Sequence, residues 1–310
     1  MSSPGATPPI VYLVTAEHAY TMGSFLDSWG AAWRHRIRVV SYADALAPPA
    51  TGFRARLRGV RRLPQRATWI FSDVERLTPA VATAAAGLWE RLAAAGARLL
   101  NHPTRSMRRY ELLRTLRATG RNRFGVYRAD EVRRPERYPV FVRDEHEHAG
   151  SRTPLLADEA ALEAALADLL SSGTSREDKL VVEFCDTADA AGLYRKYSAF
   201  VVDGRILPRH LFFARAWQVK VAAQYEPECL EEERRYVATN PHETALREIF
   251  ALARIEWGRI DYAMLDDAVQ VWEINSNPMI LTPAHVEDVA RRPVHDAFAA
   301  RLERELARLS

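Results

Sequence analysis

The stretch GRIDYAMLDDAVQVWEINSNP, residues 258–278, decides how the C-terminal part of this chain folds. Two apolar runs flank the turn-forming pair Asp266-Asp267, and this arrangement predicts a β-hairpin. Side chains alternate between the two faces of a strand, so Glu273 and Asn275 point to the same face. Pairing of the two runs brings Asp261, near the start of the first strand, beside them.

Asp261, Glu273 and Asn275 offer two carboxylates and one amide oxygen on one face of the predicted hairpin. These are hard oxygen ligands of the kind that hold Mg²⁺ against nucleotide phosphates. The alternative is a solvent-exposed strand with ordinary acidic residues. Trp272 and Ile274 favour the metal site, because they supply an apolar face while the polar residues fall on the other one.

The same hairpin resembles the C-terminal signature of the ATP-grasp superfamily, in which an Arg-x-Asp strand precedes a Glu-x-Asn strand that ends in Asn/Ser-Pro. Here the pattern is Arg259-x-Asp261, then Glu273-x-Asn275, then Pro278. The resemblance is to carboxylate–amine and carboxylate–thiol ligases, similar to RimK-like and D-alanine–D-alanine ligase-like enzymes. It implies that Asp261, Glu273 and Asn275 hold Mg²⁺ against ATP, with two ions expected and Mn²⁺ as a substitute. It also implies that Arg259 stabilises charge on the transferred phosphoryl group.

The composition is that of a soluble globular protein, with 310 residues, 48% hydrophobic content, 27% charged content and a net charge of +3. This length suits two or three modest domains. No apolar run approaches membrane-spanning length. The small, Pro-rich segment 1–9 is expected to be a disordered lead-in and lacks the pattern of a secretory signal. The two cysteines, Cys185 and Cys229, are too few for a disulfide framework, so we expect a cytoplasmic protein.

Alternating strands and helices predict a small parallel α/β domain over residues 10–104. We expect strands at 9–15, 37–42, 67–71 and 97–100, and helices at 24–35 and 79–95. Ligands of such sheets bind beyond the carboxyl ends of the strands. The residues that follow the first and third strands are therefore candidate substrate contacts, or else ordinary loop and capping residues: Glu17, His18, Tyr20, Ser72, Asp73 and Glu75.

Overall we expect an α/β protein in which the N-terminal domain precedes an ATP-grasp fold of two α+β subdomains. The smaller subdomain, a lid, spans 105–182, and the larger one, which carries the metal site, spans 183–310. In the lid we expect helices at 106–119 and 157–170 and strands at 124–127 and 138–143. The resemblance implies a basic residue facing the phosphates on the first helix, here Arg109, and a second at the end of a strand, here Arg143.

The loop 144–154 is expected to close over the phosphates. Gly150-Ser151 would offer backbone N–H groups and a hydroxyl to them. His146 and His148 in this loop suggest a metal site, but no third ligand accompanies them. We therefore favour a lid that contacts both substrate and ATP.

The segment 180–186 is expected to be a strand that runs into a polar linker, and by resemblance the adenine lies against this linker. The candidate nucleotide contacts are Glu183, Phe184, Cys185 and Asp186. Glu183 is placed near the adenine amino group and Asp186 near the ribose. The alternative for Cys185 is a small buried hydrophobe.

A hairpin is expected over 195–212, with its turn at Asp203-Gly204. Lys196 in its first strand is a candidate phosphate contact. The resemblance places the transferred phosphoryl group and the acceptor near the following region, where Lys220 is the first candidate and His210 the second. Helices are expected at 228–238 and 243–256, and a helical segment at 283–309 with a break near Pro293.

Arginine is gathered in two clusters, which either bind nucleic acid or are solvated helix faces of an Arg-rich protein. No aromatic residues interleave with them to form a stacking platform, so nucleic-acid binding is not expected, although a tRNA-linked substrate would fit. The first cluster is Arg54, Arg56, Arg58, Arg61, Arg62 and Arg66; the second is Arg105, Arg108, Arg109, Arg114, Arg117, Arg121 and Arg123.

The resemblance implies an ATP-dependent ligase that converts a carboxylate to an acyl phosphate, releases ADP and forms an amide with an amine. Arg259, Lys220, His210 and Arg143 are the expected catalytic residues. The expected partners are small-molecule or peptide carboxylates and amines, and a homodimer is an open question. Two other functions stay open: a small-molecule kinase on the same fold, and a nucleotide- or RNA-binding module that uses the arginine clusters.

Overall fold

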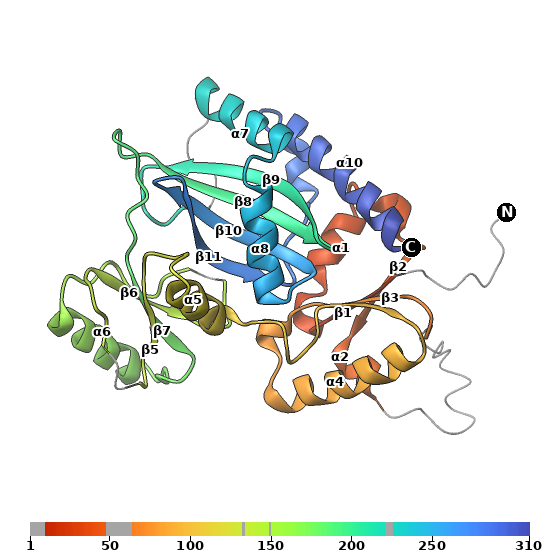
Figure 1. Ribbon diagram of the computed structural model, residues 1–310, viewed down its shortest axis with the longest axis horizontal. Helices are drawn as coiled ribbons and strands as arrows, with labels where there is room; N and C mark the ends of the chain where they lie inside the picture. The colour runs from red at the N-terminus through yellow and green to blue at the C-terminus, as the bar shows by residue number, and fades with distance from the viewer. Residues whose placement is uncertain (1–9, 48–63, 132–133, 149, 221–225) are drawn as a thin grey trace.

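The computed structural model describes residues 10–47, 64–131, 134–148, 150–220 and 226–310. Its framework consists of a four-stranded parallel sheet, a three-stranded antiparallel sheet and a four-stranded antiparallel sheet (Figure 1). The expected lead-in at 1–9, and most of the expected basic loop with five arginines of the first cluster, lie outside the described residues.

The parallel sheet has the strand order β2-β1-β3-β4. Its strands are β1 (Ile10–Val14), β2 (Ile37–Ser41), β3 (Thr68–Phe71) and β4 (Arg98–Leu100). Alternate residues of β1 enter two different cores, because helices cover both faces of the sheet. On one face pack α2 (Tyr42–Leu46) and α4 (Pro79–Ala94), and α4 begins where the Thr78 hydroxyl accepts the N–H of Val81.

The helix expected at 24–35 is wrong in its bounds. Helix α1 spans Tyr20–Leu26, and a separate 3₁₀ turn, η2, spans Ala31–Trp33. Between them the chain doubles back at Gly30, where any Cβ would overlap the ring of Phe25. Of the apolar residues that suggest one long helix, Phe25 lies in α1, Trp33 lies in η2 and Trp29 lies in the turn between them.

The three-stranded sheet has the order β5-β7-β6 and forms the centre of the small subdomain. Its strands are β5 (Val126–Arg128), β6 (Val140–Asp144) and β7 (Lys179–Glu183). Helix α6 (Glu159–Ser171) buries Leu162 and Leu166 against it. Helix α5 (Arg109–Ala118), which starts three residues later than expected, shares a core with both this sheet and the large subdomain.

The antiparallel sheet of the large subdomain has the order β11-β10-β8-β9. Its strands are β8 (Tyr194–Val202), β9 (Arg205–Ala214), β10 (Trp257–Leu265) and β11 (Ala268–Asn275). Both hairpins turn through two residues with positive φ, Asp203-Gly204 and Asp266-Asp267. Such turns match the twist of the flanking strands, so each hairpin forms where expected.

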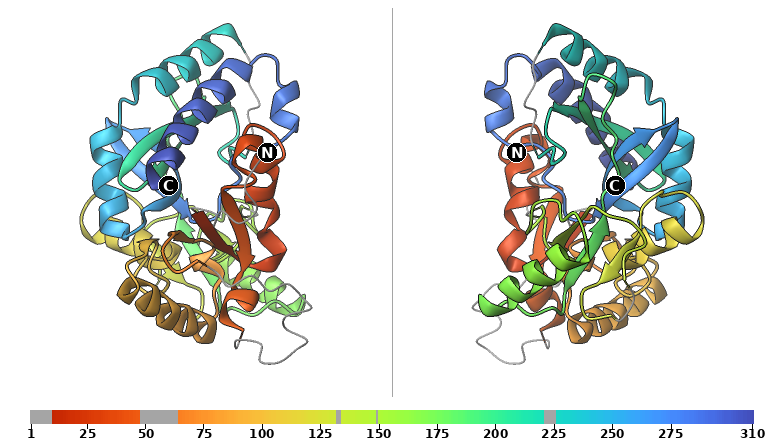
Figure 2. Two further views of the ribbon diagram at one scale, coloured as in Figure 1. Left: turned by 90° about the vertical axis from the view of Figure 1, so that its right-hand side faces the viewer. Right: turned by 90° about the vertical axis from the view of Figure 1, so that its left-hand side faces the viewer.

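Helices α7 (Pro227–Thr239) and α8 (Glu243–Ala253) cover one face of this sheet, and α10 (Arg292–Leu309) reaches its other face (Figures 1 and 2). The short helix α9 (Ala284–Glu287) precedes α10, whose first turn contains Pro293, so the expected break is present. Leu302 and Leu306 of α10 share a core with Tyr12 of β1 and Trp257 of β10. The N-terminal sheet is therefore packed against the C-terminal helix, while the domain boundaries at 104 and 182 stay predictions.

Candidate active site

A cleft is lined by residues of the three-stranded sheet and of the antiparallel sheet. Its apolar lining consists of Leu113, Phe124, Phe141, Val182, Phe184, Cys185, Trp217, Val219 and Trp272. Its polar lining consists of Arg143, His148, Gly150, Ser151, Thr187, Tyr194, Arg195, Lys196, Gln218, Lys220, Asp261 and Glu273.

Asp261 and Glu273 are paired across β10 and β11, because a β-bulge between Asp261 and Tyr262 shifts the register of the hairpin by one residue. The Glu273 carboxylate accepts from Arg109 at 2.6 Å and from Arg143 at 2.7 Å, and His148 lies 3.3 Å away. Burial alone would raise the pKa of Glu273, but Arg109, His148 and Arg143 hold it well below its ordinary value. Glu273 is therefore ionised and is surrounded by cationic groups.

Asp261 lies on β10, the strand next to β11, and opposite Glu273. Its carboxylate accepts from the Ser198 hydroxyl at 2.7 Å and from Arg259 Nε at 3.2 Å. Lys196 Nζ is 3.8 Å away. Arg259 therefore contacts Asp261, which is an expected metal ligand, and Lys196, which the sequence analysis assigns to a phosphate, lines the cleft beside it.

Asn275 completes the expected ligand set only in part. Its Oδ1 accepts the backbone N–H of Asn277 at 2.8 Å. A carbonyl oxygen has two lone pairs, so one remains for a cation. Among the described residues no group of three His, Cys, Asp or Glu side chains could hold a metal. The donor set of two carboxylates and one amide oxygen nonetheless fits Mg²⁺, which prefers few protein ligands and retains water.

Arg109 does not line the cleft, so the structure corrects its expected position. Its guanidinium donates to the backbone carbonyls of Asp144 and Glu147 at 2.8 and 2.9 Å, and to that of Glu145. A second nitrogen, Nη2, donates to Glu273. The Arg109 side chain is 3% exposed, because it lies in the first turn of α5, against the start of the lid loop. It connects the loop to β11 and does not face the cleft.

Arg143 and Lys220 line the cleft, and their roles toward a phosphate stay predictions. Burial and the charge of Arg109 lower the pKa of Arg143 to about 10, so its guanidinium is cationic at neutral pH. Gly150 of the lid loop has a φ of +97°, and a Cβ there would lie 2.6 Å from Cε of Lys220. Glycine at this position lets the loop backbone approach the Lys220 side chain closely.

The linker residues divide between the cleft and its surroundings. Phe184 and Cys185 line it, whereas the carboxylates of Glu183 and Asp186 do not. Glu183 accepts from the Tyr127 hydroxyl at 2.9 Å and from backbone N–H groups, including that of Gly125 at 2.8 Å. Strand alternation explains this correction, because Val182 faces the cleft and Glu183 faces away.

The Asp186 carboxylate accepts the backbone N–H of Ala188, two residues further along the same loop, at 3.0 Å. His210 is also absent from the cleft lining and is 5% exposed. Burial, with the charges of Arg209 and Arg259, holds the pKa of His210 well below its ordinary value. A neutral, buried imidazole does not fit the expected phosphoryl contact.

His146 and His148 diverge, so the structure gives them no common site. His146 lies 3.3 Å from Asp178. His148 lies between Glu273 and Glu75, at 3.3 and 3.4 Å, and thereby connects the lid loop to the N-terminal domain. Burial lowers the pKa of His148, but Glu273 and Glu75 raise it above its ordinary value.

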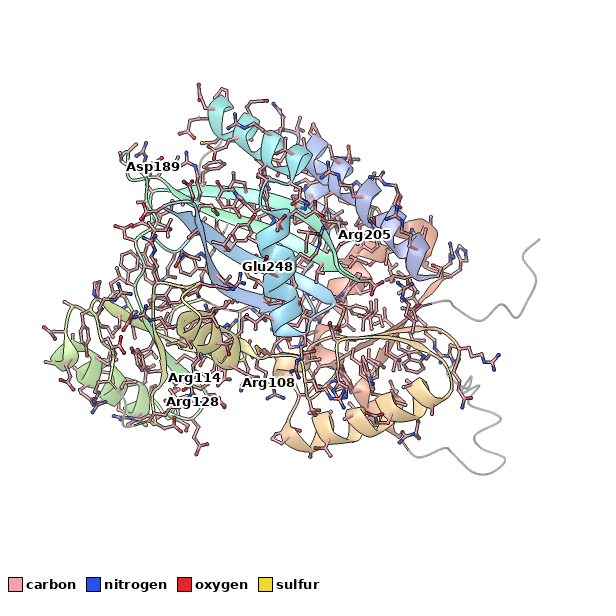
Figure 3. All side chains as sticks on the ribbon, viewed as in Figure 1. Arg108, Arg114, Arg128, Asp189, Arg205 and Glu248 are labelled. Atoms are coloured by element: carbon pink, nitrogen blue, oxygen red, sulfur yellow. The ribbon has the colours of Figure 1, made fainter. Side chains whose placement is uncertain are left out.

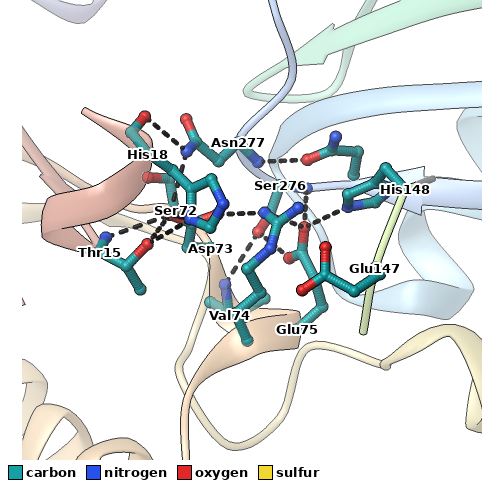
Figure 4. Close-up of polar contacts among 12 residues, drawn as sticks. Thr15, His18, Ser72, Asp73, Val74, Glu75, Glu147, His148, Ser276 and Asn277 are labelled. Carbon is teal, nitrogen blue, oxygen red and sulfur yellow. Dashed lines mark hydrogen bonds and ion pairs between the residues drawn. The ribbon is translucent and has the colours of Figure 1, made fainter. Parts of the chain in front are cut away.

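The candidate substrate contacts of the N-terminal domain meet the segment that follows β11 (Figure 4). Glu75 accepts from the Ser276 hydroxyl. Asp73 accepts from Asn277 Nδ2 at 3.0 Å, and the His18 carbonyl accepts from the same amide at 3.2 Å. The carboxyl end of the parallel sheet therefore lies against the segment that follows β11.

Four aromatic side chains line the cleft although the sequence analysis does not assign them to it: Phe124, Phe141, Trp217 and Trp272, the last of which it places only on the apolar face of the hairpin. Phe141 and Trp217 have ring centroids 4.9 Å apart, and Trp272 lies 5.2 Å from Phe124. Phe141 precedes Arg143 by two residues on β6, so the strand period could have identified it. Trp217 lies outside the strands and helices, and no periodic signal marks it.

The second arginine cluster is largely paired with acidic side chains. Arg108, Arg114 and Arg128 are seen beside α5 and β5 in Figure 3. The pairs of this region are Arg105–Glu90 at 3.9 Å, Arg117–Glu136 at 3.3 Å, Arg121–Glu248 at 2.9 Å and Arg123–Asp266 at 2.6 Å. These carboxylates offset much of the positive charge that a nucleic acid would require.

None of the helices in the described parts of the chain is both long and apolar enough to cross a membrane. No protein-family model matches the sequence. No curated protein matches it either.

Solved structures do match. The ATP-grasp ligase PsnB, complexed with a phosphomimetic variant of its minimal precursor, Mg and ADP, aligns with a TM-score of 0.54 and 14% identity, over 97% of this chain and 99% of that one. PsnB complexed with the precursor peptide PsnA2 and AMPPNP aligns with a TM-score of 0.53 and 15% sequence identity, over the same shares of the two chains. A D-alanine–D-alanine ligase from Bacillus anthracis complexed with ATP aligns with a TM-score of 0.48 and 13% sequence identity, over 96% of this chain and 98% of that one. The near-complete alignment with PsnB shows that this chain has the ATP-grasp fold.

Proposed function

We propose that this protein is an ATP-dependent ligase that activates a carboxylate as an acyl phosphate, releases ADP and joins the acyl group to an amine. The observation that carries the proposal is the convergence of Asp261, Glu273, Arg143 and Lys220 on one cleft. These residues come from separate elements, and all lie against an aromatic lining. Such a surface combines a place for a nucleoside base with charges for its phosphates.

In this proposal the base lies against the aromatic lining, which includes Phe141 and Trp272. The backbone of Phe184 and Cys185 reads the base edge. Arg143, Lys196 and Lys220 contact the phosphates. The carboxylates of Glu183 and Asp186 do not line the cleft, so both residues are left out of the proposed nucleotide site.

Asp261, Glu273 and Asn275 would hold Mg²⁺, with Mn²⁺ as a substitute, and the ions would neutralise phosphate charge so that an anionic carboxylate can approach. Arg259 and Arg143 offset the charge that spreads over the transferred phosphoryl group. The lid loop, which Arg109 connects to β11, excludes water that would hydrolyse an acyl phosphate. No side-chain nucleophile is needed.

The substrates of the proposed reaction are a small-molecule or peptide carboxylate and an amine. The peptide class is supported by the PsnB structures, which contain a precursor peptide. A homodimer stays a prediction. Two other functions are outcomes of the test below: a small-molecule kinase, and a nucleotide- or RNA-binding module. The paired arginines of the second cluster argue against the module.

The test is ADP release with ATP and Mg²⁺ in the presence of hydroxylamine and pools of amino acids and small carboxylic acids. We expect acid-dependent ADP together with a hydroxamate, because hydroxylamine traps acyl phosphates. Glu273→Gln should abolish both products, whereas Glu248→Gln, an exposed glutamate on α8, should retain them. ADP without hydroxamate would indicate a kinase. No nucleotide turnover despite ATP binding would contradict the proposal and favour a binding module.

A further inference from the structure

Three polar side chains of the N-terminal domain, connected by hydrogen bonds, lie beside the segment that follows β11. Thr15 follows β1, and His18 ends the 3₁₀ turn η1 (Ala16–His18) directly after it. Asp73 follows β3, which pairs with β1. The Thr15 hydroxyl lies 2.7 Å from the Asp73 carboxylate and 2.8 Å from Nδ1 of His18 (Figure 4).

The directions of these hydrogen bonds fix the tautomer of His18. A carboxylate only accepts, so Thr15 donates its single hydroxyl proton to Asp73. The Thr15 oxygen must then accept from His18, so Nδ1 carries the ring proton. A neutral imidazole protonated at Nδ1 presents a lone pair at Nε2.

Asp73 is held firmly at the far end of this chain. It is fully buried, and its carboxylate also accepts from the Thr15 N–H at 3.1 Å, from Asn277 Nδ2 at 3.0 Å and from Arg76 at 2.7 Å. Its backbone has a φ of 54°. The imidazole is therefore oriented through Thr15 by a carboxylate that cannot move away.

The other end of the chain is accessible. The His18 side chain is 25% exposed, and no described residue forms a hydrogen bond with its Nε2. The neighbouring groups that carry or can acquire charge are Glu17, the Tyr20 ring at 6.2 Å, and Asp73 with Arg76. The His18 carbonyl meets Asn277, two residues after the proposed metal ligand Asn275. The backbone of His18 therefore lies beside the segment that follows the proposed metal ligand Asn275, and its Nε2 has no hydrogen-bond partner among the described residues.

We propose that His18, oriented by Thr15 and Asp73, is the general base that deprotonates the incoming amine. This inference rests on the proposed ligase function. Near neutral pH an alkyl amine is mostly an ammonium ion, which has no lone pair and cannot attack. Carboxylate activation needs no base, so His18 serves only the second half of the reaction.

The ammonium group gives one proton to Nε2, which makes His18 an imidazolium ion. The freed electron pair forms a C–N bond to the acyl carbon. The C–O bond to phosphate breaks, and its electron pair leaves with the phosphate. The departing phosphate takes the second N–H proton from the adduct, and His18 returns its proton to water.

The experiment compares two small nucleophiles, hydroxylamine and methylamine, which differ in protonation. Hydroxylamine is mostly neutral near neutral pH and needs no base, whereas methylamine is almost entirely protonated. His18→Asn keeps a donor for Thr15, because the Asn amide occupies the place of Nδ1, but it removes the base. We expect it to form hydroxamate within about threefold of the wild-type rate and methylamide at least about 100-fold more slowly. Free imidazole should restore methylamide formation in His18→Ala.

Three results would overturn the inference. They are equal losses of hydroxamate and methylamide in His18→Asn, unchanged methylamide formation in that variant, and a wild-type protein that makes hydroxamate but no methylamide. Thr15→Val supplies a second variant that retains the imidazole but loses its orientation, and we expect about tenfold slower methylamide formation with normal hydroxamate. Loss of hydroxamate from the wild-type protein itself would instead refute the ligase function.

Discussion

Arg109 gives the sharpest test of the site geometry, because sequence and structure assign it different roles. The sequence places it at the ATP phosphates. In the structure its guanidinium donates to three lid-loop carbonyls and to Glu273, and its side chain is 3% exposed. Arg109→Met should therefore destabilise the nucleotide-free protein.

The magnitude follows from the groups left behind. Removing one partner of a buried ion pair costs about 3–5 kcal/mol when the other charge is left uncompensated. Here Arg143 and His148 still contact Glu273, so that part of the cost is smaller. Three carbonyls lose a charged donor at the same time. We expect a loss of about 2–3 kcal/mol in the free energy of unfolding.

The assay is urea unfolding followed by tryptophan fluorescence without nucleotide. Arg108→Met is the matched control, because it removes the same charge one residue earlier but only one hydrogen bond, to the Leu77 carbonyl. We expect that variant to lose about 1 kcal/mol or less. Equal losses in the two variants, or an intact stability with weakened ATP binding in Arg109→Met, would refute the structural role and favour the sequence-based one.

Three further changes test other parts of the site. Burial would raise the pKa of Glu75, but its hydrogen bond to His148 and the charge of His148 lower it to about 2. The pKa of Glu75 in the folded protein lies below its ordinary value of 4.5, so Glu75 should contribute about 3 kcal/mol of stability, which is lost as the pH falls from 4.5 to about 2. In Glu75→Gln the free energy of unfolding should depend less on pH across this range. An unchanged pH dependence in that variant would contradict this prediction. Gly258→Ala should lower the melting temperature and the free energy of unfolding, the latter by about 1–3 kcal/mol, because the added Cβ would lie 2.8 Å from a carbonyl oxygen of β11. Gly23→Ala is the control and should leave both unchanged, because no atom lies within 4 Å of its Cβ. Trp272→Ala should weaken ATP binding about tenfold by calorimetry if the base stacks in the cleft, and an unchanged affinity would place the base elsewhere.

The hairpin could be predicted from sequence because its geometry is local. The two-residue turn fixes the register from Leu265 opposite Ala268 to Tyr262 opposite Val271. Continued unchanged, that register would place Asp261 opposite Trp272. A β-bulge between Asp261 and Tyr262, which the turn does not predict, brings Asp261 opposite Glu273. The same holds for β1, whose unbroken apolar run indicates a strand buried on both faces.

The directions of long side chains could not be predicted in this way. Arg109 turns to the lid-loop carbonyls and Glu183 turns to backbone N–H groups, because each satisfies buried polar atoms that come from another part of the chain. The meeting of Glu75 with His148 needs the N-terminal domain, the lid and the large subdomain to be placed together. Local periodicity carries no information about such a placement.

The central claim is that a carboxylate oxygen of the substrate becomes an oxygen of phosphate. The most direct measurement supplies the carboxylic acids labelled with oxygen-18, together with ATP, Mg²⁺ and the amine pool, and analyses the released phosphate by mass spectrometry. An acyl phosphate intermediate predicts inorganic phosphate that carries label from the acid, with none in Glu273→Gln. Unlabelled phosphate released at the same rate as ADP would contradict the account, because ATP would then be hydrolysed without activation of a carboxylate.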